Sequence, residues 1–379
     1  MRLRCAVPVN MPHAKSITRS FPTMTFPAAL RAYRYRVDDE LEQYLQEEIS
    51  SVRDKDVMVA DALDHVRTAL LAGGKRLRGA CMYYAYRAAG GNDEQEAIAA
   101  SVSIELLHAF LLIHDDIIDR DDYRHGQPTL HAMYGKMAKK KFQDADAEHF
   151  GMSLAISLGD MVAALAQKRL FLSRFPAERI VAALRRLQVV ISETTIGQIK
   201  DVRMGVEAKS ATEEEVLKMY EQKTARYTLE GPLHLGATLA GAEDSIFRSL
   251  SAYALPVGIA YQIHDDILGI FGESQTTGKP VGSDLEEGKV TILISHAYRH
   301  ANRTQRSRMD AILRAPLKDE QLEEMRMIFR STGALDHARE TRDAFLERGR
   351  LAAVKIPSGE SQSQDFFSGL VSYLAHRSV

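Results

Sequence analysis

Residues 105–119 read ELLHAFLLIHDDIID, an apolar helical stretch that ends in Asp115, Asp116 and Asp119. Residues i and i+4 of an α-helix project from the same face, so the carboxylates of Asp115 and Asp119 are expected to lie side by side. Ionised carboxylates next to an apolar core need a compensating charge. Magnesium supplies one, because it prefers oxygen ligands and often bridges carboxylates to substrate phosphates. Taken alone, this stretch also fits an ordinary solvated helix end.

A second stretch repeats this arrangement about 150 residues later. Residues 255–268 read LPVGIAYQIHDDIL and end an apolar helix with Asp265 and Asp266. A solvated helix end would now have to occur twice by coincidence. We therefore expect the two helices to meet and to share one cluster of metal ions.

Apolar residues recur at helical spacing along nearly the whole chain from Asp38 onward, beginning with Leu41, Leu45 and Ile49. No run of alternating strands with hairpin turns interrupts them. The pattern predicts an all-α protein with a single domain at residues 38–379. Helices are predicted at residues 75–89, 94–119, 152–172, 177–204, 212–240, 245–271, 291–301, 318–331 and 333–354, with loops at 123–127, 136–149, 204–211 and 272–288.

Residues 1–37 differ from the rest in carrying seven Lys and Arg residues and no acidic residue. This composition resembles a transit peptide, which leaves import into an organelle open. The alternative is a disordered N-terminal extension. We favour the extension, because the prolines at positions 8, 12, 22 and 27 would break an amphipathic helix.

Composition excludes several classes of protein. The chain has 379 residues and a formal net charge of −2, so no overall basic field indicates binding of nucleic acid. Two cysteines without a CxxC pair argue against a disulfide framework or a cysteine zinc site. No apolar run approaches the roughly 20 residues that cross a bilayer, so we expect no transmembrane segment and a cytoplasmic location.

A cationic motif lies at residues 73–78, which read GGKRLR. It places Lys75 and Arg78 three residues apart in the first turn of a predicted helix, where arginine side chains and free N–H groups suit phosphate. Lys223, Lys279 and Lys289 are candidate further cations. Carboxylates and cations without a GxxxxGK[ST] loop favour a diphosphate substrate over a P-loop nucleotide.

Taken together and in this order, these motifs resemble the trans-type isoprenyl diphosphate synthases, and the resemblance covers residues 38–354. The matching elements are Gly73–Arg78, His108, Asp115–Gly126, Gln198–Asp201, Lys223–Thr224 and Gln262–Lys289. The resemblance implies a bundle of long antiparallel helices around a deep central cavity. It also implies a homodimer that takes no nucleic acid, binds about three Mg²⁺ ions per site and joins isopentenyl diphosphate to an allylic diphosphate.

The resemblance also implies a role for each matching residue. Isopentenyl diphosphate would be bound by Lys75, Arg78 and His108. Magnesium would be held by Asp115, Asp116 and Asp119, and on the second motif by Asp265 with Asp266 in support. The allylic diphosphate would contact Arg124, Lys223, Lys279 and Lys289. The reacting centre would be lined by Lys223, Thr224 and Gln262, with Gln198 and Asp201 next to the metal ligands.

Two positions depart from the family's motifs. His125 stands where the family usually has a second arginine that contacts isopentenyl diphosphate, and a histidine cannot make the arginine fork. Gly269 stands where many relatives have the third aspartate of the second motif, although some relatives share the glycine.

The residues before Asp115 bear on product length. In the family, bulk at the fourth and fifth residues before this aspartate acts as a floor under the growing chain, and here they are Leu111 and Phe110. One aromatic residue at the fifth position resembles geranylgeranyl-producing relatives. The alternative is that Phe110 only packs against a neighbouring helix.

Three other functions fit the sequence less well. A ferritin-like di-iron protein needs two Glu-x-x-His motifs, and only one, Glu105 to His108, was found in the chain. A terpene cyclase is closer in fold, but Lys75 and Arg78 suit a second diphosphate, which argues against this function. A catalytically weak regulatory subunit of a heteromeric synthase should have lost acidic ligands, yet Asp115, Asp119 and Asp265 are present.

Overall fold

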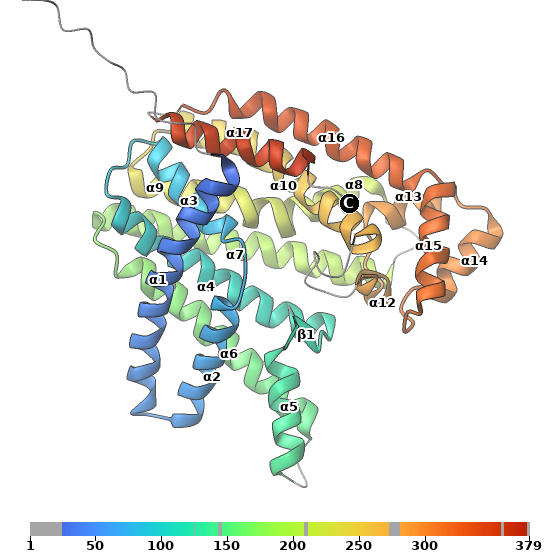
Figure 1. Ribbon diagram of the computed structural model, residues 1–379, viewed down its shortest axis with the longest axis horizontal. Coiled ribbons are helices and arrows are strands. Elements are labelled where there is room, and N and C mark those ends of the chain that lie inside the picture. The colour runs from blue at the N-terminus through green and yellow to red at the C-terminus, as the bar shows by residue number, and fades with distance from the viewer. Residues whose placement is uncertain are drawn as a thin grey trace, which may run out of the picture.

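The computed structural model describes residues 25–124, 126–142, 146–207, 211–272, 281–357 and 360–376. These residues are almost entirely helical, which confirms the predicted all-α class (Figure 1). Within them, sheet is limited to one antiparallel pair, β1 (Tyr123–Arg124) and β2 (Gln127–Pro128), where the sequence predicts a loop.

The helices follow one another along the chain with short connections. The first half contains α1 (Phe26–Arg53), α2 (Val57–Leu71), α3 (Leu77–Ala88), α4 (Glu94–Asp119), α5 (Leu130–Lys141), α6 (Ala147–Phe171) and α7 (Ala177–Val206). The middle contains α8 (Glu213–Tyr220), the π-helix η1 (Glu221–Glu230), α9 (Gly231–Ala240) and α10 (Asp244–Phe271). The last part contains α12 (Ser283–Glu287), α13 (Ile292–His300), α14 (Arg303–Ile312), α15 (Asp319–Ser331), α16 (Ala334–Ala353) and α17 (Ser361–His376).

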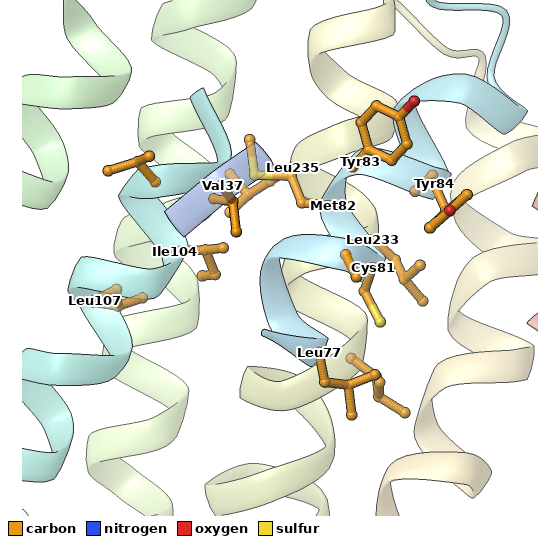
Figure 2. Close-up of a cluster of buried hydrophobic side chains, with 14 of the residues drawn as sticks. Val37, Leu77, Cys81, Met82, Tyr83, Tyr84, Ile104, Leu107, Leu233 and Leu235 are labelled. Carbon is orange, nitrogen blue, oxygen red and sulfur yellow. The ribbon is translucent and has the colours of Figure 1, made fainter. Parts of the chain in front are cut away.

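The core forms where α1, α3, α4 and α9 meet. Figure 2 shows Val37 of α1, Met82 of α3 and Leu235 of α9 side by side, and each is at most 1% exposed. Helix α4 is buried on all sides over most of its length, as expected for a helix that is apolar all round. This packing holds the end of α4, and with it the first aspartate motif, in a fixed position.

Helix α1 begins at Phe26 rather than near Asp38, so residues 26–37 are not part of an extension. Pro27 occupies one of the first two helical positions, where its missing N–H has no partner to lose. Phe26 and Tyr33 are buried against the core. Residues 1–24 lie outside the described part of the chain, and their role stays a prediction.

The segment predicted as one helix at residues 212–240 is three helices, with η1 in the middle. Close contacts hold η1 on two sides. A Cβ atom on Gly197 of α7 would lie 2.4 Å from the backbone nitrogen of Lys223. A Cβ atom on Gly258 of α10 would lie 2.5 Å from the Ala225 Cα. Only glycine permits such an approach. Ten residues of π-helix are unusual, and π-helical turns are frequent at functional sites.

Helices α4 and α6 are long and apolar enough to cross a membrane by length and composition. The apolar window of α4 is 72% buried within the protein, as in the core helix of a globular fold, whereas that of α6 is 39% buried. Length and composition alone therefore do not establish a membrane span. The low burial of α6 does show that this helix has an apolar face that the rest of the protein leaves uncovered.

Candidate active site

The two aspartate motifs meet at η1. Lys223 Nζ lies 3.7 Å from Asp115 Oδ1 at the end of α4. The next residue, Thr224, donates a hydrogen bond of 2.7 Å from Oγ1 to Gln262 Oε1 on α10. Because these two contacts come from adjacent residues, the structure brings both motifs to one place, as the repeated aspartates suggest.

Arg124 binds the carboxylates at the end of α4. Its guanidinium lies 2.5 Å from Asp116 Oδ1, 3.3 Å from Asp121 Oδ2 and 4.0 Å from Asp115 Oδ2. Burial alone would lower the pKa of Arg124, but the charges of Asp116, Asp115 and Asp121 outweigh it and raise that pKa. Arg124 therefore stays charged and neutralises part of the negative charge at the end of α4.

Lys223 is held between two carboxylates. Its Nζ donates to Asp201 Oδ2 of α7 at 2.5 Å, besides its contact with Asp115. Burial lowers the pKa of Lys223, and the charges of Asp201 and Asp115 more than restore it. Gln198, one turn before Asp201, has a buried Nε2 with no hydrogen-bond partner among the described residues. This donor is available to a ligand.

Lys289 closes the site from the segment before α13. Its Nζ donates to Asp119 Oδ2 at 2.6 Å, forms a short ion pair with Glu287 and lies 3.9 Å from Asp284 Oδ1. Burial opposes the charge on Lys289, but these carboxylates raise its pKa well above the usual value. Carboxylate oxygens of Asp119, Asp121 and Glu287 lie within 4.8 Å of one another.

Asp266 lies in a buried hydrogen-bond network. It is 3% exposed, accepts a hydrogen bond from Tyr220 and accepts another of 2.8 Å from Gln262 Nε2. Burial and the charge of Asp284 raise the pKa of Asp266 to about 8. The Ile292 amide donates to the Tyr220 hydroxyl at 2.8 Å, which ties α13 to this network.

Gly269 leaves room for a carboxylate from elsewhere in the chain. A Cβ atom built on Gly269 would lie 3.1 Å from Asp284 Oδ2. Many relatives have an aspartate at the position of Gly269. Here the side chain of Asp284, on α12, lies next to that position instead. The missing aspartate does not leave this part of the site without an acidic group.

A second cationic group lies at the start of α3. Arg78 donates to Thr228 Oγ1 at 3.0 Å, lies 3.3 Å from His108 Nε2 and stacks 4.4 Å from the ring centre of Tyr227. Its Nε is buried without a hydrogen-bond partner among the described residues. Lys75 is exposed and lies 5.7 Å from the ring centre of Tyr373.

Arg76, between these two cations, has a structural role. It adopts a left-handed conformation with φ 54° and is 5% exposed. Its guanidinium binds Asp38 at 2.7 Å and Glu105 at 3.4 Å. These contacts turn Arg76 inward, so that Lys75 and Arg78 are left for another partner.

The residues at the two motifs fit magnesium. They offer only carboxylate oxygens, with Asp115 and Asp119 on α4 and Asp265 on α10, and hard divalent cations prefer such ligands. Cationic side chains contact several of these carboxylates directly, which shows that the site needs positive charge. A set made only of carboxylate oxygens is typical of sites for hard cations, and it lacks the imidazole and thiolate groups common at zinc sites.

Phe110 and Leu111 are partly buried at the edge of the main core. The Phe110 ring packs against His114 at 4.8 Å between centres, and His114 lies over Gly159 of α6. Leu111 is one turn before Asp115 and shares its face. The role of both residues as a floor stays a prediction.

Some residues of the site have no signal in the sequence motifs. Tyr220, Tyr227 and Thr228 orient predicted site residues but carry no distinctive spacing. Asp284 and Glu287 lie within residues 262–289, which resemble the family, but no motif of their own marks them as site residues. Two predicted residues, His125 and Lys279, lie outside the described residues.

Comparisons with known proteins identify the family of the chain. The family model for polyprenyl synthetase matches residues 60–330 of the chain. The chain is 34% identical over 310 residues to a geranylfarnesyl diphosphate synthase from Aeropyrum pernix, covering 81% of this chain and 91% of that protein. It is also 34% identical over 310 residues to a geranylgeranyl pyrophosphate synthase from Geoglobus acetivorans, covering 81% and 88%.

A solved structure gives the same result. The chain resembles a geranylgeranyl pyrophosphate synthase from Corynebacterium glutamicum, complexed with isoprenyl diphosphate and magnesium. The TM-score is 0.87 at 30% identity, over 92% of this chain and 99% of that one. The matches confirm the resemblance seen in the motifs and span both aspartate pairs, so the chain belongs to the polyprenyl synthetase family.

Proposed function

We propose that the protein condenses isopentenyl diphosphate with allylic diphosphates and releases geranylgeranyl diphosphate as its main product. One observation supports two diphosphate sites in particular. The cations at the aspartate motifs contact carboxylates. Arg78 instead contacts His108, Thr228 and Tyr227, none of which carries a fixed charge. The first group suits a metal-bound diphosphate, and the second suits a diphosphate bound by cations alone.

The side chains divide the reaction between them. Asp115, Asp119 and Asp265 would hold about three Mg²⁺ ions, which as Lewis acids neutralise the allylic diphosphate and make it a better leaving group. Lys223, Arg124 and Lys289 keep their charge and stabilise the departing diphosphate electrostatically. Arg78 and Lys75 would hold isopentenyl diphosphate so that its double bond attacks the allylic carbocation. A proton then leaves the new chain, and the released diphosphate is the proposed acceptor.

The regulatory-subunit alternative has no support. A subunit without catalysis would be free to lose Asp115, Asp119, Lys223 and Asp201, yet each is present and engaged in a buried polar network. A cytoplasmic location and the absence of a membrane span stay predictions.

Chain length is tested at Phe110. We expect Phe110→Ala to lengthen the main product by at least one five-carbon unit, because the smaller side chain deepens the cavity below Asp115. Each helical residue advances about 1.5 Å, so Phe110 lies roughly 7.5 Å below that aspartate. Products from dimethylallyl, geranyl and farnesyl primers are identified by chromatography after dephosphorylation. The same assay with wild-type protein tests the proposed product.

Leu112→Ala is the matched control. Leu112 is on the same helix but points about 200° away from Phe110, so this change should leave product length unaltered. An unchanged product from Phe110→Ala would show that the ring only packs against a neighbouring helix and that the chain-length proposal is wrong.

The dimer is proposed to form through α6 and α7. Apolar side chains lie exposed along α7 at intervals of three, seven and eight residues, which is one helical face. They include Val181 at 55%, Val189 at 61%, Ile196 at 39%, Ile199 at 63% and Val206 at 76% exposed. A large uncovered apolar face marks an interaction surface, and a second copy of the chain would cover it symmetrically.

We expect the double variant Val189→Glu, Ile196→Glu to sediment as a monomer, because each pairing would bury uncompensated carboxylates. Wild-type protein should sediment as a dimer. Val354→Glu, which changes an equally exposed valine just after α16, should stay dimeric. A monomeric wild type would contradict the proposal.

A further inference from the structure

Three histidine rings form a stack away from the aspartate motifs. On α13, His296 lies 4.0 Å from His300 between ring centres, and on its other side it lies 4.3 Å from His337 of α16. Glu213, the first residue of α8, accepts a hydrogen bond of 3.0 Å from His337 Nε2. Three helices that are distant in sequence therefore present imidazole and carboxylate groups to one point.

The spacing of these groups is close to that of metal ligands. One ligand atom each from Glu213, His296 and His337 lies within 4.8 Å of the other two. Ligand atoms of a tetrahedral zinc ion lie about 3.3 Å apart, since Zn–N and Zn–O bonds are about 2.0–2.1 Å long. The pair His337 Nε2 and Glu213 Oε1 is already at 3.0 Å, and the His296 ring would have to turn to close the remaining gap.

The surroundings prepare the imidazoles for coordination. His300 Nδ1 lies 2.9 Å from the His296 carbonyl oxygen, so the donated proton leaves Nε2 of His300 as the lone-pair nitrogen. Such a hydrogen bond fixes ring orientation around a metal. His337 is 30% and Glu213 is 23% exposed, so an ion can enter from solvent.

We propose that Glu213, His296 and His337 form a site for a divalent transition-metal ion of the zinc class, with water or His300 as the fourth ligand. Imidazole suits zinc, copper, nickel and iron, whereas magnesium prefers oxygen alone. The metal takes the position of the proton on His337 Nε2, and that proton moves to Nδ1 of the same ring. This site is therefore chemically distinct from the aspartate motifs.

The bound ion would fasten α8, α13 and α16 to one another next to the active site. Tyr220 ends α8 about 10 Å from Glu213 and binds Asp266. The same tyrosine accepts a hydrogen bond from Ile292 at the start of α13. A tie at the far ends of both helices stabilises the framework behind the second aspartate motif.

The test uses the full chain, freed of metal by a chelator and returned to excess Mg²⁺. Addition of ZnCl₂ should raise the melting temperature by a few degrees, since a ligand that binds only the folded state stabilises it. Calorimetry should give one zinc per chain at this site. Co²⁺ in place of Zn²⁺ should give the visible absorption bands of a low-symmetry nitrogen and oxygen site.

The variants His337→Gln and His296→Gln should each lose the zinc-dependent shift and the Co²⁺ bands while melting normally without metal. Glutamine keeps a hydrogen-bonding group, and neither residue belongs to the catalytic machinery, so activity in Mg²⁺ alone should be unchanged. His376→Gln, which alters an exposed histidine on α17, should keep the shift, and so should Asp115→Asn.

Three results would overturn the proposal: no shift in the wild type, an equal shift in His337→Gln and His296→Gln, or a shift lost in Asp115→Asn. The first two would mean that the histidines form a hydrogen-bonded stack without metal. The third would mean that zinc binds at the aspartate motifs. None of these results depends on whether the chain makes a prenyl diphosphate.

Discussion

Asp115→Ala is expected to lower kcat by about 10³-fold or more, because charge stabilisation at the departing diphosphate contributes the largest part of catalysis in such a site. Asp115 lies 3.7 Å from Lys223 and 4.0 Å from Arg124, so its loss removes a proposed metal ligand and disturbs two cations together. Steady-state kinetics in excess Mg²⁺ measures the effect.

The fold should survive this change, because the Asp115 side chain is 24% exposed and lies at a helix end. Circular dichroism of the variant should match that of the wild type. Asp336→Ala is the control, since Asp336 is 76% exposed on α16 and should keep full activity. If Asp115→Ala retained wild-type turnover, the aspartates would not hold the catalytic metal.

Lys223→Met is expected to affect both activity and stability. It removes the charge proposed to stabilise the allylic diphosphate, and kcat should fall by about 10²- to 10³-fold. It also leaves Asp201, whose side chain is 7% exposed, without its partner at 2.5 Å. An uncompensated buried carboxylate of this kind costs about 3 kcal/mol, which denaturant unfolding of the metal-free protein measures.

The double variant Lys223→Met, Asp201→Asn separates the two effects. Removing the second charge should restore most of the free energy of unfolding, because no buried charge remains unpaired. It should not restore kcat, because the cation is still missing. Recovery of activity in the double variant would mean that Lys223 only neutralises Asp201 and does not act on substrate.

Local signals explain which elements the sequence predicts well. Helix α4 was predicted at Glu94–Asp119 and has those bounds. Asp93 caps its first turn, and Arg120 ends it in a left-handed conformation with φ 59°. Both aspartate pairs were found for the same reason, because their spacing is a property of one helix.

Other elements depend on contacts that spacing does not encode. The π-helix η1 has the composition of an ordinary helix, and close packing at Gly197 and Gly258 distinguishes it only in three dimensions. Helix α14 buries only Met309 and Ile312, which is too few residues for a clear helical period. The sequence does not predict the start of α1 at Phe26, because a proline such as Pro27 ends a helix when it lies inside one but is tolerated in the first turn.

The site residues also divide into those that local motifs predict and those that only the fold brings together. Lys75, Arg78 and Lys223 could be named as candidates because they belong to short motifs, and their roles stay predictions. Asp284 could not be placed beside Gly269, because that contact depends on how α12 returns to the end of α10. The Glu213, His296 and His337 group likewise joins three helices and leaves no local motif.

The central proposal is that this site joins the carbon chains of two prenyl diphosphates. The allylic diphosphate ionises in a metal-dependent step and its diphosphate group is released. The most direct measurement follows labelled isopentenyl diphosphate into prenyl product with farnesyl diphosphate as the primer, together with the diphosphate released. We predict one diphosphate released for each five-carbon unit incorporated, with both signals abolished by chelation of Mg²⁺ and restored by its return. Incorporation that persisted in excess chelator, or diphosphate release without incorporation, would contradict the account.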